Sequence, residues 1–64
     1  MTTKIIEALE YALQKETEAK EHYEDMAKMA EDPETRLLCE QIAREETSHY
    51  NKLNERLIAI KLLG

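Results

Sequence analysis

Two glutamates and a histidine are the residues best suited to do chemistry: Glu46 and His49 in the segment REETSHYNKL, and Glu16 thirty residues earlier. Each occupies a position where helical spacing favours an apolar residue. Burying a carboxylate is unfavourable unless a positive partner lies beside it, and no Lys or Arg shares these positions. Carboxylate and imidazole groups together suit Fe(II), Mn(II) or Zn(II). The three residues therefore predict a metal site.

The spacing of Glu46 and His49 allows both side chains to bind one ion, because residues three positions apart on a helix project about 60° from each other. Glu16 would supply a third ligand from a neighbouring helix. It lies 17 residues before Pro33, the only strong break in the chain, and Glu46 lies 13 residues after Pro33. Antiparallel helices joined at this break bring the two glutamates to a similar height.

The composition predicts two long helices. The 64 residues include one Gly, one Pro and 36% charged residues, and most of the others are good helix formers. In AEDPETR, Asp32 can cap a new helix and Pro33 can take its first position. We expect one domain, 1–64, with helices over about 3–30 and 33–62. The short connection makes the helices antiparallel neighbours.

The sequence also predicts the residues that end these helices and the ion pairs on their surfaces. Thr2 or Thr3 is the predicted cap of the first helix, and Gly64 is the predicted stop of the second. Oppositely charged residues four positions apart are expected to support the helices on their solvent faces. These pairs are Glu16 with Lys20, Glu24 with Lys28, and Glu40 with Arg44.

An apolar stripe with residues spaced by threes and fours follows each predicted helix. A chain this short buries only about 60% of its unfolded surface, so one hairpin is marginally stable alone. A second hairpin packed on the first would cover the stripes and make a four-helix bundle from two chains. The fold class is therefore all-α, an antiparallel hairpin that dimerises. The stripes comprise Ile6, Leu9, Leu13, Glu16, Ala19, Tyr23, Met26, Ala27 and Ala30, then Leu38, Cys39, Ile42, Glu46, His49, Leu53, Leu57 and Ile60.

The charge balance restricts the partners. Fourteen acidic and nine basic residues give a net charge of −5, with no basic run, which argues against nucleic acid and anionic membranes. No apolar run is long enough to span a bilayer. Cys39 is the only cysteine and has no internal disulfide partner. We expect a cytoplasmic protein that binds neither nucleic acid nor membranes.

Two segments resemble the rubrerythrin-type ferritin-like proteins. ETEAKEHY, 16–23, resembles their Glu-x6-Tyr segment, and IAREETSH, 42–49, resembles their Glu-x-x-His segment, with MAKMAEDPETR between them. The similarity covers about residues 6–55. Two such hairpins supply four glutamates and two histidines, the ligand set known for ferritin-like di-iron proteins. Because this chain has one hairpin rather than two, the resemblance is closest to the encapsulated ferritins, two-helix proteins with an iron site between subunits.

The resemblance implies a di-iron ferroxidase that oxidises Fe(II) for iron storage or detoxification. Glu16, Glu46 and His49 would be its metal ligands and catalytic residues, in a site shared by two chains. Tyr23 would lie beside a ligand carboxylate and hydrogen-bond to it. Separately, the charge of Glu18 would attract cations towards the site.

The resemblance also implies partners. They are a second copy of the chain or a larger homo-oligomer, such as a ring of dimers, and an encapsulin shell, which would place the protein inside an encapsulin nanocompartment. Mn or Zn are expected substitutes for Fe. Haem is not expected, because Met26 and Met29 at helical spacing are typical core residues.

Two alternatives stay open. One is a rubrerythrin-like, peroxide-scavenging di-iron protein, and the other is a metal-free structural or adaptor bundle. Rubrerythrins that reduce peroxide draw electrons from a domain that holds iron on four cysteines. Because the chain contains Cys39 alone, and Fe(II) oxidation needs no built-in donor, ferroxidase activity ranks first. The sequence leaves the native metal, the oxidant and the oligomer size open.

Overall fold

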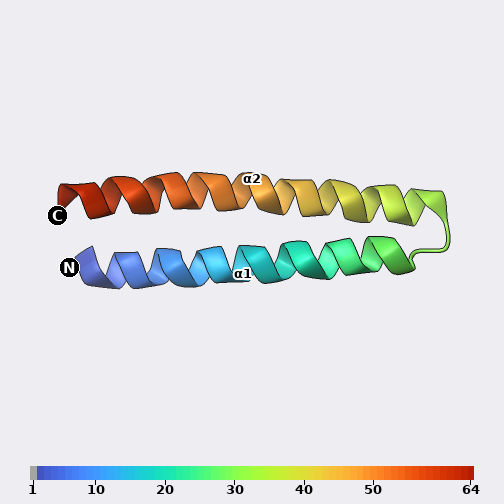
Figure 1. The fold of residues 1–64 in the computed structure, drawn as a ribbon, viewed down its shortest axis with the longest axis horizontal. Helices are drawn as coiled ribbons and strands as arrows, with labels where there is room; N and C mark the ends of the chain where they lie inside the picture. The colour runs from blue at the N-terminus through green and yellow to red at the C-terminus, as the bar shows by residue number, and fades with distance from the viewer. Residues whose placement is uncertain (1) are drawn as a thin grey trace.

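Two helices make up almost all of the computed structural model, which describes residues 2–64, with side chains from residue 3 onward. They are α1, Thr2–Met29, and α2, Pro33–Leu63. The helices run antiparallel and side by side, joined by a short connection (Figure 1). The predicted all-α hairpin is confirmed. Over the described residues, neither helix has a stretch long and apolar enough to cross a membrane.

The start of α2 is determined by its own first residues. Asp32 has an extended backbone, and its carboxylate accepts a hydrogen bond of 2.8 Å from the backbone N–H of Thr35. Pro33, which has no N–H to leave unpaired, takes the first helical position. This backbone hydrogen bond holds the pKa of Asp32 below its ordinary value. The predicted cap is confirmed.

The other helix ends differ in how well they were predicted. α1 already includes Thr2 and Thr3, so neither is its cap, and the position before them lies outside the described residues. At the end of α2, Gly64 adopts a left-handed backbone with φ of 92°, and its N–H donates to the Lys61 carbonyl at 3.3 Å. This conformation favours glycine and ends the helix as predicted.

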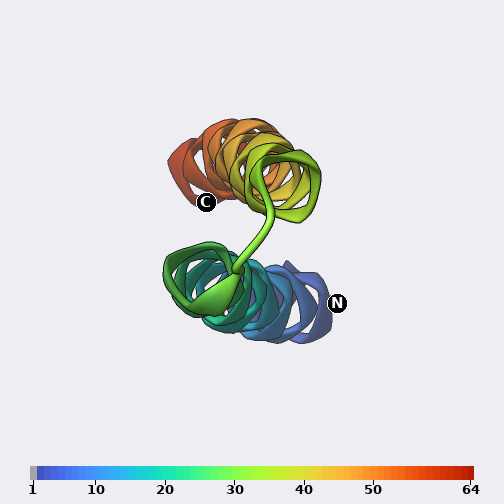
Figure 2. The same cartoon turned by 90° about the vertical axis from the view of Figure 1, so that its right-hand side faces the viewer.

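The contact between the helices is narrow. The Cα atoms span 49 × 14 × 11 Å, and the view along the pair shows that neither side of the hairpin is covered by another described segment (Figure 2). Leu38, predicted within the apolar stripe, is 55% exposed, whereas Ala43 is buried without having been predicted. Leu38 and Cys39 project 100° apart, so both cannot face α1. The buried residues are Leu13, Ala27, Cys39, Ala43, Leu57 and Ile60.

The ion pairs differ from those expected. Within residues 3–64, none of the three predicted pairs at spacing four is formed. Lys15 instead pairs with Glu18 at 3.3 Å, and Lys61 pairs across the helices with Glu10 at 3.6 Å. Exposed pairs contribute only about 0.2–1 kcal/mol, which is too little to hold long side chains in one geometry.

The cap of α2 generates a stability prediction. Asp32→Ala removes the acceptor for the Thr35 N–H and should lower the melting temperature by several degrees at pH 7. Because the folded pKa of Asp32 is lowered, its contribution is present above the unfolded pKa and is lost as pH falls through the folded pKa. Thermal circular dichroism should therefore show the difference from wild type shrinking below about pH 4.

The matched control is Asp25→Ala, which changes the other aspartate, an exposed residue within α1. It should leave the melting temperature unchanged or raise it slightly, since Ala is the better helix former. An equal loss in both variants would show that Asp32 does not act as a cap.

Candidate metal centre

Glu16 of α1 and Glu46 and His49 of α2 meet near the middle of the hairpin. One potential ligand atom from each residue lies within 4.8 Å of the other two. His49 Nδ1 is 3.4 Å from Glu16 Oε2 and 4.0 Å from Glu46 Oε1. The structure thus brings together the three residues that the sequence singled out, and their role as ligands stays a prediction.

The two carboxyl groups are crowded and incompletely satisfied. Their side chains are only 22% and 17% exposed for Glu16 and Glu46, and among the described side chains Glu16 Oε2 is buried without a hydrogen-bond donor. A hydrogen bond that protonated Glu46 donates to Glu16, together with burial and the charge of Glu16, raises the pKa of Glu46. His49 opposes this shift. A divalent cation would satisfy the orphaned oxygen and neutralise both carboxylates, so the residues fit a metal ion.

His49 lies at the edge of the helix contact, and 53% of its side chain is exposed. Leu38 and Leu63, 11 residues before it and 14 after it, lie on the same side of α2 by helical spacing. These leucines are 55% and 81% exposed. We call this side of α2 the apolar face, with Leu38, His49 and Leu63 as its defining residues. Exposed Lys52 and Arg56 lie on the same side, so one edge of the metal centre opens onto an uncovered surface that combines leucines with charged residues.

A small cavity of about 160 Å³ adjoins the two carboxylates. The threonine hydroxyls there donate to backbone carbonyls, Thr17 to Leu13 at 3.0 Å and Thr47 to Ala43 at 3.3 Å, so these protons are not available to the glutamates. Lys20, which lies outside the apolar stripes, also lines the cavity and brings a positive charge near the carboxylates, without forming an ion pair among residues 3–64. The lining residues are Glu16, Thr17, Lys20, Glu46, Thr47 and Tyr50.

The spacing pattern did not reveal the threonines or Tyr50, whereas it places Lys20 beside Glu16 as an ion-pair partner. A weak signal was available for the threonines, since the dipeptide Glu-Thr occurs at 16–17, 34–35 and 46–47. The first and last copies place a carboxylate and a short hydroxyl side by side at the same height of the hairpin.

Two further predicted residues form no hydrogen bond or ion pair with the ligand set among the described side chains. Tyr23 is half-buried, with its ring edge-to-face against His22 at a centroid distance of 5.5 Å, and its hydroxyl makes no hydrogen bond to another described side chain. Glu18 is exposed and pairs with Lys15, which compensates its charge. The proposed roles of Tyr23 and Glu18 stay predictions.

Comparison with known proteins identifies one family. The family model for rubrerythrin matches residues 1–57. The match spans most of both helices and includes the positions of Glu16, Glu46 and His49. No curated protein and no solved structure matches the chain.

The crowding of the carboxylates predicts an unusual stability effect. Because the folded pKa of Glu46 is raised, its contribution to stability is present below the unfolded pKa and is lost as pH rises through the folded pKa. Metal-free Glu46→Gln should therefore melt a few degrees above wild type at pH 7.5 and close to wild type at pH 4. Differential scanning calorimetry measures both values.

Added Mn(II) or Fe(II) should reverse the order at pH 7.5, because an ion that binds only the folded wild type raises its melting temperature. Glu55→Gln, at an exposed position of α2, is the control and should follow wild type throughout. A metal-free Glu46→Gln protein that melts below wild type at pH 7.5 would contradict the proposed repulsion.

Proposed function

Because the chain belongs to the rubrerythrin family of ferritin-like di-iron proteins, we propose that it is a ferroxidase that oxidises Fe(II) for iron storage or detoxification. The observation that carries the proposal is the opposed pair of Glu16 and Glu46, with one buried oxygen lacking a donor and with His49 beside both. Carboxylate oxygen and imidazole nitrogen are suitable ligands for iron.

The proposed site contains residues of two chains. One hairpin contributes two glutamates and one histidine, which is half of the ligand set of the ferritin-like di-iron proteins. A second hairpin packed on the apolar face would bury Leu38 and Leu63 and bring its own three ligands to the uncovered side of His49. A two-fold symmetric dimer achieves both through a single contact surface, so we propose a homodimer or a larger oligomer built from it.

In this proposal Fe(II) is the substrate, and two Fe(II) ions at one site provide the two electrons that, with two protons, convert O2 to H2O2 and leave two Fe(III). Glu16 and Glu46 act as carboxylates, so the proton favoured by the raised pKa of Glu46 must leave when iron binds. His49 binds through a neutral ring nitrogen.

The first test of this proposal concerns assembly. At micromolar concentration the protein should be a dimer or larger by multi-angle light scattering, because the exposed apolar face and the half-complete ligand set both need a second chain. Leu38→Glu places a charge on that face and should shift the protein towards monomer. Ile58→Glu, at a position 51% exposed and nearly opposite His49 on α2, should not. A helical wild-type monomer of 7.5 kDa, unchanged by Fe(II), would refute the shared site.

The second test concerns catalysis. Fe(II) is added at low multiples of the chain concentration, and ferric absorbance is followed in the near ultraviolet with O2 or H2O2 as the oxidant. Wild type should oxidise iron rapidly up to about one ion per chain. Glu16→Ala, Glu46→Ala and His49→Ala should each slow this phase by about tenfold or more, because each removes a ligand.

Glu55→Ala is the control for catalysis, and it should retain the wild-type rate. A much higher rate with H2O2 than with O2 would assign the site to peroxide reduction rather than to ferroxidase activity. If wild type oxidises iron no faster than buffer with either oxidant, the assignment fails.

A further inference from the structure

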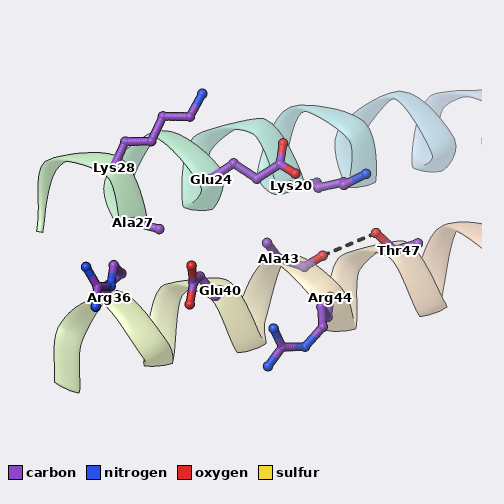
Figure 3. Close-up of a pocket in the computed structure, with 9 residues that line it drawn as sticks. All are labelled: Lys20, Glu24, Ala27, Lys28, Arg36, Glu40, Ala43, Arg44 and Thr47. Atoms are coloured by element: carbon purple, nitrogen blue, oxygen red, sulfur yellow. Dashed lines mark hydrogen bonds between the residues drawn. The ribbon is translucent and has the colours of Figure 1, made fainter. Parts of the chain in front are cut away.

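A wider groove of about 710 Å³ lies between the helices in the half of the hairpin nearer the connection. Its floor consists of small side chains. Ala27 of α1 and Ala43 of α2 are both buried and project towards the space between the helices (Figure 3). Two methyl groups do not fill this space, so the groove stays open to a ligand.

Six charged residues line this groove. Along each helix, one acidic side chain lies between two basic side chains. Four cations and two acids give the groove a local charge of +2, whereas the rest of the chain has 9 − 4 = 5 cations and 14 − 2 = 12 acids, a charge of −7. The cations of an acidic protein are thus concentrated in one place. The residues are Lys20, Glu24, Lys28, Arg36, Glu40 and Arg44.

The four cations line the groove two at each end and have no acidic partners among residues 3–64. None of the six charged side chains takes part in an ion pair with any side chain of residues 3–64. Lys28 and Arg36 lie at the end near the connection, and Lys20 and Arg44 lie at the other end, with the two glutamates between them (Figure 3). Eight residues along a helix separate the two cation pairs by about 12 Å.

We propose that this groove binds small phosphate-class oxyanions, one at each pair of cations. An arginine offers a planar fork of N–H donors that matches two phosphate oxygens, and a lysine adds a mobile positive charge. Lys28 and Arg44 point away from the space between the helices (Figure 3), so both side chains would have to turn inward around the ligand. Glu24 and Glu40 lie between the two ends of the groove and repel negative charge there. This repulsion disfavours a single long polyanion and favours a separate small anion at each end.

The location makes this site independent of the proposed oligomer. Glu40 and His49 are nine residues apart on α2, which places them on opposite sides of the helix. A second chain packed on the apolar face therefore leaves the groove open. Lys20 and Thr47 line both this groove and the small cavity at the two carboxylates, so a bound anion would lie next to the metal centre.

The test uses the full 64-residue chain, freed of metal with a chelator, in isothermal titration calorimetry with inorganic phosphate. Sodium chloride at equal ionic strength serves as the blank. Wild type should show saturable binding in the millimolar range. Lys28→Gln and Arg44→Gln should each weaken it by about tenfold, the loss expected for one charged hydrogen bond. Lys52→Gln and Arg56→Gln, matched exposed cations outside the groove, should bind like wild type.

Glycerol phosphate in a parallel titration distinguishes free phosphate from a phosphate group carried by a larger molecule. Tighter binding of this monoester would assign the groove to monoesters, and equal or weaker binding would assign it to inorganic phosphate; both outcomes support the site. The absence of saturable binding with either, or equal losses in the control variants, overturns it. An acidic peptide that binds when neither phosphate does would make the groove a protein-docking surface and would also overturn it.

Discussion

Two carboxylates opposed across the only helix contact of the hairpin are the constraint on which the rest of the structure depends. Glu16 and Glu46 lie within a contact that buries six apolar side chains among residues 3–64, so little packing energy is available to offset their repulsion. Without a metal, this crowding raises the pKa of Glu46, because a proton on one carboxyl group relieves the repulsion. A bound cation would replace that proton, which links occupancy of the site to folding of the chain.

The small residues near these carboxylates explain why the hairpin has two different sides. Ala27 and Ala43 leave space between the helices, and Thr17 and Thr47 turn their hydroxyl protons to the backbone rather than to the glutamates. On one side the space becomes a groove lined with charge. On the other side, His49 lies at the edge of the helix contact, on the same side of α2 as exposed leucines. A single pair of helices therefore presents a charged face and an apolar face to different kinds of partner.

The features that could be predicted from the sequence are those determined locally or by counting from the connection. Asp32 and Pro33 start α2 through one hydrogen bond and one missing N–H, and a short connection brings Glu16 and Glu46 to the same height. The burial of Ala43 rather than Leu38, and the presence of Tyr50 at the carboxylates, depend on how each helix is rotated about its own axis. That rotation is set by packing along the whole contact. The ion pairs were missed because their energies are too small to select one rotamer.

The three proposed ligands differ in solvent exposure, and this difference explains why one chain would not suffice for metal chemistry. Glu16 and Glu46 are held inside the hairpin, whereas His49 is more than half exposed and lies on the face that lacks a cover. An ion bound by one hairpin would keep several coordination positions open to water and would lack a second metal beside it. In the proposed dimer, a second copy on the apolar face would remove water from that side and double the ligands in one step. Assembly and metal binding would then stabilise each other, because each would contribute what the other lacks.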